Sequence, residues 1–111
     1  MKKVESVIRG NKLDQVEKAL SHLGVSGITV SQVLGWGRQK GHITEFYRGK
    51  EVEVRLLPKV KIEVIVNDGE CDEVKKIIAE NAKTGNIGDG VIWVTPVEDF
   101  VRIRTAENIL D

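Results

Sequence analysis

A glycine-rich stretch and a pair of arginines are the residues whose types and spacing could bind an anion. The stretch Thr84–Gly90 contains three glycines, which let a backbone approach an anion closely and direct several N–H groups at it. Arg102 and Arg104 would supply neutralising charge and bidentate donors, and Arg38 and Lys40 add further cations. Together they indicate a polyphosphate ligand. A helix cap followed by a tight turn would also explain the glycines, and no Gly-Lys-Ser/Thr sequence follows as in a Walker loop.

The other reactive side chains do not form an enzyme site. No Ser/His/Asp or Cys/His set stands at plausible positions for nucleophilic catalysis. His22 falls on the exposed side of a predicted helix, and His42 falls in a long loop, where it either touches a ligand or partner or is solvated. We interpret Cys71 as a plain, partly buried thiol. Because these three residues are far apart in the sequence, they make no metal site, and the sequence predicts a binding protein without catalytic residues.

Charge balance and composition exclude several classes of protein. The chain has 17 basic and 17 acidic residues, whereas a nucleic-acid-binding protein needs an excess of Lys and Arg to displace counterions. No apolar run approaches the roughly 20 residues of a membrane span, so we expect no direct membrane insertion. The single cysteine fits a reducing compartment, and Glu5 stands where a signal peptide would have its apolar stretch. We therefore expect a cytoplasmic protein.

Hydrophobic periodicity predicts elements in the order strand, helix, strand, strand, helix, strand. Alternation indicates strands at 3–9, 28–34, 59–66 and 91–97, with a short final strand at 101–104. Apolar residues at helical spacing indicate helices at 12–23 and 71–82. This order is typical of an α+β, ferredoxin-like βαββαβ fold, in which both helices cover one face of an antiparallel sheet. At 111 residues, we expect residues 1–111 to form a single domain.

The second face of the predicted sheet has no covering layer within the chain. A bare sheet face is costly unless it is polar or meets another subunit. We therefore expect the protein to be an oligomer.

The segment from about 37 to 55 is too long for an ordinary connection between two strands. It mixes charges of both signs with glycines and a few aromatic residues, and its last part, 51–55, alternates and could prolong the third strand. Loops longer than about 12–15 residues in a compact domain are usually functional or disordered. We expect a functional, flexible loop here.

Five collinear motifs resemble those of the PII nitrogen-regulatory signalling proteins. They are Gly35–His42 (GWGRQKGH), Tyr47–Gly49 (YRG), Leu57–Glu63 (LPKVKIE), Thr84–Gly90 (TGNIGDG) and Arg102–Thr105 (RIRT). The similarity covers nearly the whole chain, in order and at the family's spacing. It implies a trimer of ferredoxin-like subunits with a nucleotide site in each cleft between them. ATP and ADP would compete for each site, and 2-oxoglutarate would join through the magnesium ion of ATP.

The resemblance also implies which residues meet the ligands. Contacts with the adenine nucleotide are implied for Gly27, Thr29, Gly37, Arg38, Ile65, Gly88, Asp89, Gly90, Arg102 and Arg104, with the arginines on the phosphates. Gln39 would ligate magnesium, and Lys59 would pair with a carboxylate of 2-oxoglutarate. Residues 37–55 would be the family's T-loop. There Tyr47, Arg48 and Gly49 would contact targets such as an ammonium channel or the enzymes and regulators of nitrogen assimilation.

The chain departs from the family pattern at several positions. Val91 follows Gly-Asp-Gly where the family usually has lysine, and Val52 and Lys50 stand where family members carry a modifiable tyrosine or serine. Ile43 lengthens the loop by one residue. Besides a PII-type regulator of nitrogen metabolism, the residues leave open a PII-like relative that senses nucleotides without 2-oxoglutarate and serves another pathway. A slow ATP hydrolase and a purely structural trimer on the same fold also remain open.

Overall fold

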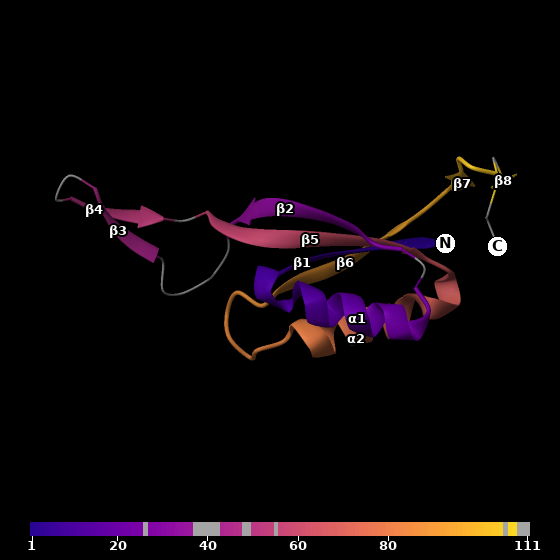
Figure 1. Cartoon of the computed structure of the whole chain (residues 1–111), viewed down its shortest axis with the longest axis horizontal. Coiled ribbons are helices and arrows are strands. Elements are labelled where there is room, and N and C mark those ends of the chain that lie inside the picture. The colour runs from indigo at the N-terminus through magenta and orange to yellow at the C-terminus, as the bar shows by residue number, and fades with distance from the viewer. Residues whose placement is uncertain (26, 37–42, 48–49, 55, 106, 109–111) are drawn as a thin grey trace.

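A computed structural model describes residues 1–25, 27–36, 43–47, 50–54, 56–105 and 107–108, and within them one antiparallel sheet carries both helices on a single face (Figure 1). The sheet has the order β2-β5-β1-β6. Its strands are β1 (Lys2–Ile8), β2 (Thr29–Gly35), β5 (Leu57–Val66) and β6 (Gly90–Pro96). The helices are α1 (Leu13–Leu23) and α2 (Cys71–Ala82), each preceded by a short 3-10 turn, at Gly10–Lys12 and Asp68–Glu70. The predicted ferredoxin-like βαββαβ fold is confirmed.

The core lies between the helices and the sheet. Alternating side chains of β1 and β5 point toward the helices, and a stripe of apolar residues on each helix packs onto them. The largest fully buried apolar side chains are Val4, Ile8, Val16, Leu20, Ile62, Val64, Val74 and Ile78. Full burial of such a side chain stabilises the fold by roughly 1.5–3 kcal/mol. Helix α1 ends at Gly24, whose φ of 99° gives the left-handed C-cap that glycine favours.

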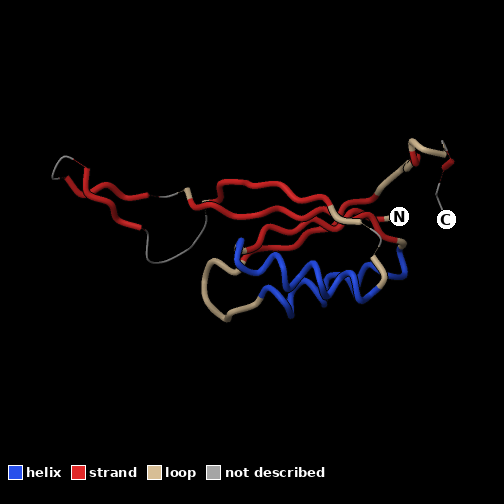
Figure 2. The backbone as a smooth tube through the Cα atoms, viewed as in Figure 1, coloured by secondary structure: helices blue, strands red, loops and turns tan. Residues whose placement is uncertain are grey.

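Residues 51–54 do not prolong the third strand of the fold, contrary to the sequence-based interpretation, and Arg55 lies outside the described residues. Instead β3 (Ile43–Tyr47) and β4 (Lys50–Val54) pair with each other in a separate antiparallel hairpin, in register from Ile43 with Val54 to Tyr47 with Lys50. This hairpin lies beyond the ends of β2 and β5, at one end of the long axis (Figure 2). By pairing with each other, these two neighbouring extended segments satisfy their backbone groups locally, which an unpaired extension of β5 could not do.

The predicted final strand is shorter than expected. Strand β7 covers only Val101–Arg102 and pairs with β8 (Glu107–Asn108), and residues 103–105 lie in a turn. The pairing of Arg102 with Glu107 brings the chain back on itself, so the backbone must leave the extended conformation after Arg102. Arg104 therefore lies in the turn, and the predicted extension of the final strand to residue 104 is wrong.

A network of charged side chains occupies the sheet face opposite the helices. Lys61 Nζ lies 2.9 Å from one carboxylate oxygen of Glu5, and Lys3 Nζ lies 3.1 Å from the other. Lys61 is also 3.8 Å from Glu63 and 5.7 Å from the ring centroid of Trp93. Glu5 is only 5% exposed, although no helix covers this face among the described residues. The open face is thus polar at its centre.

Glu5→Gln should change how stability depends on pH. The hydrogen bond from Lys61, joined by that from Lys3, holds the pKa of Glu5 below its usual value, although burial opposes the shift. A carboxylate whose pKa is depressed by folding stabilises the fold above its unfolded pKa, about 4.3 for Glu. That stability is lost as the pH falls through the folded pKa. Glu5→Gln should lower the free energy of unfolding at neutral pH and reduce its fall in acid, as urea denaturation can measure.

The matched control is Glu17→Gln on the exposed side of α1. Its free energy of unfolding should follow that of the wild type across the same pH range. Identical pH curves for the Glu5 and Glu17 variants would contradict the role given to the Glu5 carboxylate.

Candidate functional site

The glycine-rich stretch forms a loop between α2 and β6 that is organised around Asp89. The Asp89 carboxylate accepts hydrogen bonds from the backbone N–H groups of Thr84, at 2.7 Å, and Gly85, at 2.8 Å, and from the Thr84 hydroxyl. Gly85, Gly88 and Gly90 all have positive φ, between 91° and 114°, which glycine adopts without steric cost. These hydrogen bonds, with the Thr84 hydroxyl first, hold the pKa of Asp89 well below its usual range. The side chain of Asp89 is therefore an ionised structural group.

Arg9 connects this loop to the end of β1. Its Nε donates to Asp89 Oδ1 at 3.2 Å, and its Nη2 donates to the carbonyl oxygen of Ile87 at 2.9 Å. Arg9 is not among the residues that the sequence predicted for the site. Its partners lie 78 and 80 residues away, so no local spacing indicates the contact.

Lys59, on β5, reaches the same loop. Its Nζ donates to the carbonyl oxygen of Gly88 at 2.7 Å. Partial burial, together with the nearby charge of Arg9, lowers the pKa of Lys59, and Asp89 acts in the opposite direction. We call Arg9, Lys59 and residues 84–90 the loop end of the sheet. Here the structure brings together four of the predicted ligand residues: Lys59, Gly88, Asp89 and Gly90.

A second group of predicted residues lies around the other end of β5. Ile65 and Arg102 line a cavity of about 200 Å³ together with Val25 and Phe100. Thr29 pairs with Glu63 in the register between β2 and β5, two residues from Ile65. We call the cavity and Thr29 the cavity end of the sheet. Arg104 is exposed in the turn that follows β7.

The two ends are separated along β5. Lys59 and Ile65 are six residues apart in one extended strand, about 20 Å at 3.3 Å per residue. A single chain therefore does not bring all the predicted residues into one site. The predicted residues Gly37, Arg38, Gln39, Arg48 and Gly49 lie outside the described part of the chain. Tyr47 ends β3, and Gly27 precedes β2.

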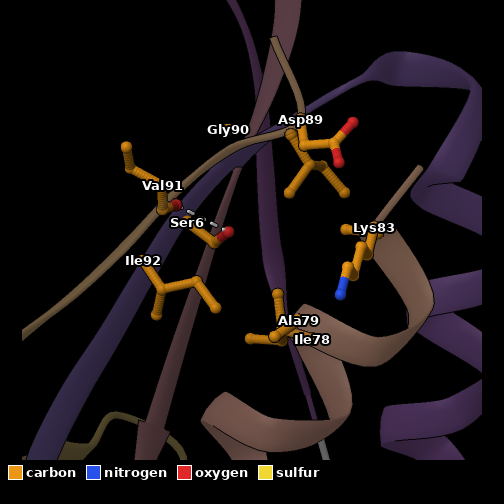
Figure 3. A pocket seen from close by; sticks show the side chains of 10 residues that line it. Ser6, Ile78, Ala79, Lys83, Asp89, Gly90, Val91 and Ile92 are labelled. Atoms are coloured by element: carbon orange, nitrogen blue, oxygen red, sulfur yellow. Dashed lines mark hydrogen bonds between the residues drawn. The ribbon is translucent and has the colours of Figure 1, made fainter. Parts of the chain in front are cut away.

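A further cavity, of about 290 Å³, lies beneath the start of β6 (Figure 3). Its walls include Ile8, Ile78, Ala79, Ala82 and Ile92, with Lys83 and Asp89 also lining it. The hydroxyl of Ser6 donates to the carbonyl oxygen of Val91 at 3.0 Å, which ties β6 to β1 beside this cavity.

The described residues contain no cluster of three or more His, Cys, Asp or Glu placed to hold a metal ion. In the same part of the chain, neither helix is long and apolar enough to cross a membrane.

The sheet order and the placement of the helices define a ferredoxin-like α+β protein, with a glycine-rich loop centred on Asp89 before its last main strand. The chain belongs to the P-II family, because it matches the family model "Nitrogen regulatory protein P-II" over residues 1–107. It is 55% identical over 107 residues to the nitrogen regulatory protein P-II of Azospirillum brasilense, covering 96% of this chain and 95% of the relative.

Other relatives carry the same name. The nitrogen regulatory protein P-II of Rhizobium meliloti is 52% identical over 111 residues, covering 100% of this chain and 98% of the relative. The nitrogen regulatory protein P-II of Synechocystis is 53% identical over 107 residues, covering 96% of this chain and 95% of the relative. Because these relatives are named as regulators, the comparisons point to a regulatory and not an enzymatic role.

Proposed function

We propose that this protein is an adenine-nucleotide-sensing regulator of nitrogen metabolism. It binds ATP or ADP in the clefts between the subunits of a homotrimer and controls target proteins through the T-loop, residues 37–55. The observation that carries the proposal is the division of the predicted ligand residues between two ends of one sheet, about 20 Å apart along β5. Neither end is a complete nucleotide site by itself.

The loop end has the chemistry of a phosphate site. Arg9 and Asp89 form an ion pair with each other. The ammonium group of Lys59 is therefore the cation at the loop end that has no direct ion pair with a carboxylate among the described residues. At Gly85 the space that a Cβ would take is open, which leaves the backbone there accessible to close approach by an anion. This end supports binding of the phosphate chain of a nucleotide.

The cavity end has the chemistry of a base and sugar site. Ile65, Val25 and Phe100 offer apolar contact, and Arg102 offers bidentate donors to a phosphate oxygen. Its volume of about 200 Å³ is smaller than the roughly 300–1,000 Å³ of typical ligand pockets. A second surface is therefore needed to enclose a nucleotide here.

A ring of identical subunits supplies that second surface. In a closed ring each interface joins one patch of a subunit to a different patch of its neighbour. The cavity end of one subunit then meets the loop end of the next, and a nucleotide spans the two. The open sheet face, with Trp93 and Val91 exposed around the ion pairs of Glu5, would pack toward the other subunits. Cytoplasmic location fits this role.

Mixed trimers test the division of the site between subunits. Lys59→Ala and Arg102→Ala subunits, carrying different tags, should each form trimers with weak ATP binding. When the two variants are co-expressed in equal amounts, about a quarter of the interfaces should join two unaltered ends and bind ATP with wild-type affinity. Calorimetry on the mixture should detect this tight fraction. Its absence from confirmed mixed trimers, with both parents weak, would contradict a site shared between subunits.

Magnesium and 2-oxoglutarate would enter through residues near the loop end. Gln39 would ligate the magnesium ion of ATP, and Lys59 would pair with a carboxylate of 2-oxoglutarate. Tyr47, Arg48 and Gly49 would face targets such as an ammonium channel or nitrogen-assimilation enzymes and regulators.

One observation favours a second candidate function. Val91 is 60% exposed immediately after Gly90, and it offers neither charge nor donor to a second anionic ligand. This favours a P-II-type protein that senses nucleotides with little or no response to 2-oxoglutarate and serves another pathway. The two candidates differ in one measurable quantity, the affinity for 2-oxoglutarate in the presence of magnesium and ATP.

A further inference from the structure

We propose that Arg9 is a positioning residue for the nucleotide site. It holds the loop 84–90 in a phosphate-binding arrangement through Asp89 and Ile87, without contacting the nucleotide itself. This inference rests on the proposed nucleotide binding at the loop end. Three features of the contacts around Arg9 support it.

The first feature is the kind of contact that Arg9 makes. The hydrogen bonds from Thr84 and Gly85 to Asp89 span only five and four residues, so they fix the internal shape of the loop. The contacts of Arg9 instead join the loop to the end of β1, at Asp89 through Nε and at Ile87 through Nη2. Two donors of one planar guanidinium fix both the distance and the orientation of the loop relative to the sheet.

The second feature is the position of Lys59. Its ammonium group donates to the Gly88 carbonyl oxygen at 2.7 Å and thereby also ties the loop to the sheet. An arriving anion competes for the same ammonium group, which weakens this tie at the moment of binding. Among the described side chains, the guanidinium of Arg9 then remains to join residues 87–89 to the sheet.

The third feature is electrostatic. Asp89 is ionised within the loop that is proposed to receive phosphates, and a bare carboxylate there would repel them. Arg9 Nε lies 3.2 Å from this carboxylate, and both side chains are about three-quarters buried, at 25% and 23% exposed. Arg9 thus balances the charge of Asp89 and leaves the charge of Lys59 available to the ligand.

The test compares ATP and ADP affinities of the intact protein with those of Arg9→Ala, Asp89→Asn and the double variant. Arg9→Ala should weaken the affinity for both nucleotides roughly tenfold. Arg9→Lys should recover part of this loss, because an ammonium group can reach Asp89 but cannot hold both contacts. If Arg9 acts through Asp89, the double variant should lose much less than the product of the two single losses. Lys18→Ala removes the same charge from the exposed face of α1 and should leave the affinities unchanged.

Amide hydrogen exchange without nucleotide gives a second readout. Exchange at residues 85–89 should rise in Arg9→Ala, while the amides in the centre of α2 should keep their wild-type protection. Arg9→Lys serves the same comparison if Arg9→Ala does not fold.

Three results would overturn the inference. The first is wild-type nucleotide affinity in Arg9→Ala, and the second is unchanged hydrogen exchange in the loop. The third is independent losses of affinity in the double variant, which would mean that Arg9 contacts the nucleotide directly. If the wild type bound no nucleotide, the proposed function would fail by itself, and the exchange experiment would still decide whether Arg9 holds the loop.

Discussion

Gly90→Ala is expected to lower the free energy of unfolding by about 3 kcal/mol, the combined cost of overpacking and of a left-handed backbone for alanine. A Cβ atom at position 90 would lie 1.8 Å from the carbonyl oxygen of Val7 and 2.9 Å from its carbonyl carbon. The φ of 114° also belongs to a region that L-residues with a side chain avoid. Since both obstacles are backbone, neither can be relieved by a side-chain rotation. Urea denaturation at matched protein concentration measures the effect.

Gly85→Ala is the matched control for this prediction. Gly85 has a φ of 91°, but no atom beyond its own chain neighbours lies within 4 Å of the position that a Cβ would take. Its replacement should therefore carry only the conformational cost, about 1 kcal/mol. Equal losses for the two variants would show that the close approach of β6 to β1 does not constrain position 90.

Arg102→Ala should weaken the binding of both ATP and ADP by about 1.5–3 kcal/mol, or ten- to a hundredfold, the range for a hydrogen bond to a charged group. Arg102 lines the cavity that also contains Ile65 and Phe100, where a phosphate oxygen would meet its guanidinium. Arg104→Ala should act in the same direction. Calorimetric titration of the purified variants measures both effects.

Lys76→Ala provides the comparison for Arg102, since it removes a cation from the exposed face of α2. Its nucleotide affinities should match those of the wild type. If Arg102→Ala and Arg104→Ala both bound ATP as tightly as the wild type, the proposed contact of these arginines with the phosphates would be contradicted.

The fold could be predicted from sequence because its signals are local and periodic. The apolar spacing at residues 71–82 predicts helix α2 with the bounds that the structure shows, and the alternation at 59–66 predicts most of β5 and its buried face. The pairing of β3 with β4 and the turn after Arg102 were missed because each depends on which segment pairs with which. Alternation alone does not specify a partner strand.

The site was only partly predictable, for a related reason. Glycine and arginine types mark a candidate anion site, but the contact of Lys59 with the carbonyl oxygen of Gly88 was not among the predictions. The pairing of Arg9 with a loop about 80 residues later leaves no mark in the local sequence. The distance between Lys59 and Ile65 is equally invisible until both are placed on one strand. The trimer, the T-loop and the ligand contacts remain predictions.

Calorimetric titration of the wild-type protein with ATP, and then with ADP, tests nucleotide sensing most directly. We expect saturable binding of both nucleotides at one site per chain, with ADP displacing ATP. Adding 2-oxoglutarate with magnesium at saturating ATP then separates the two candidate functions. Tight binding of 2-oxoglutarate supports a regulator that responds to this ligand, and little heat supports the second candidate. No saturable binding of either ATP or ADP, in a protein shown to be folded, would contradict the proposed function.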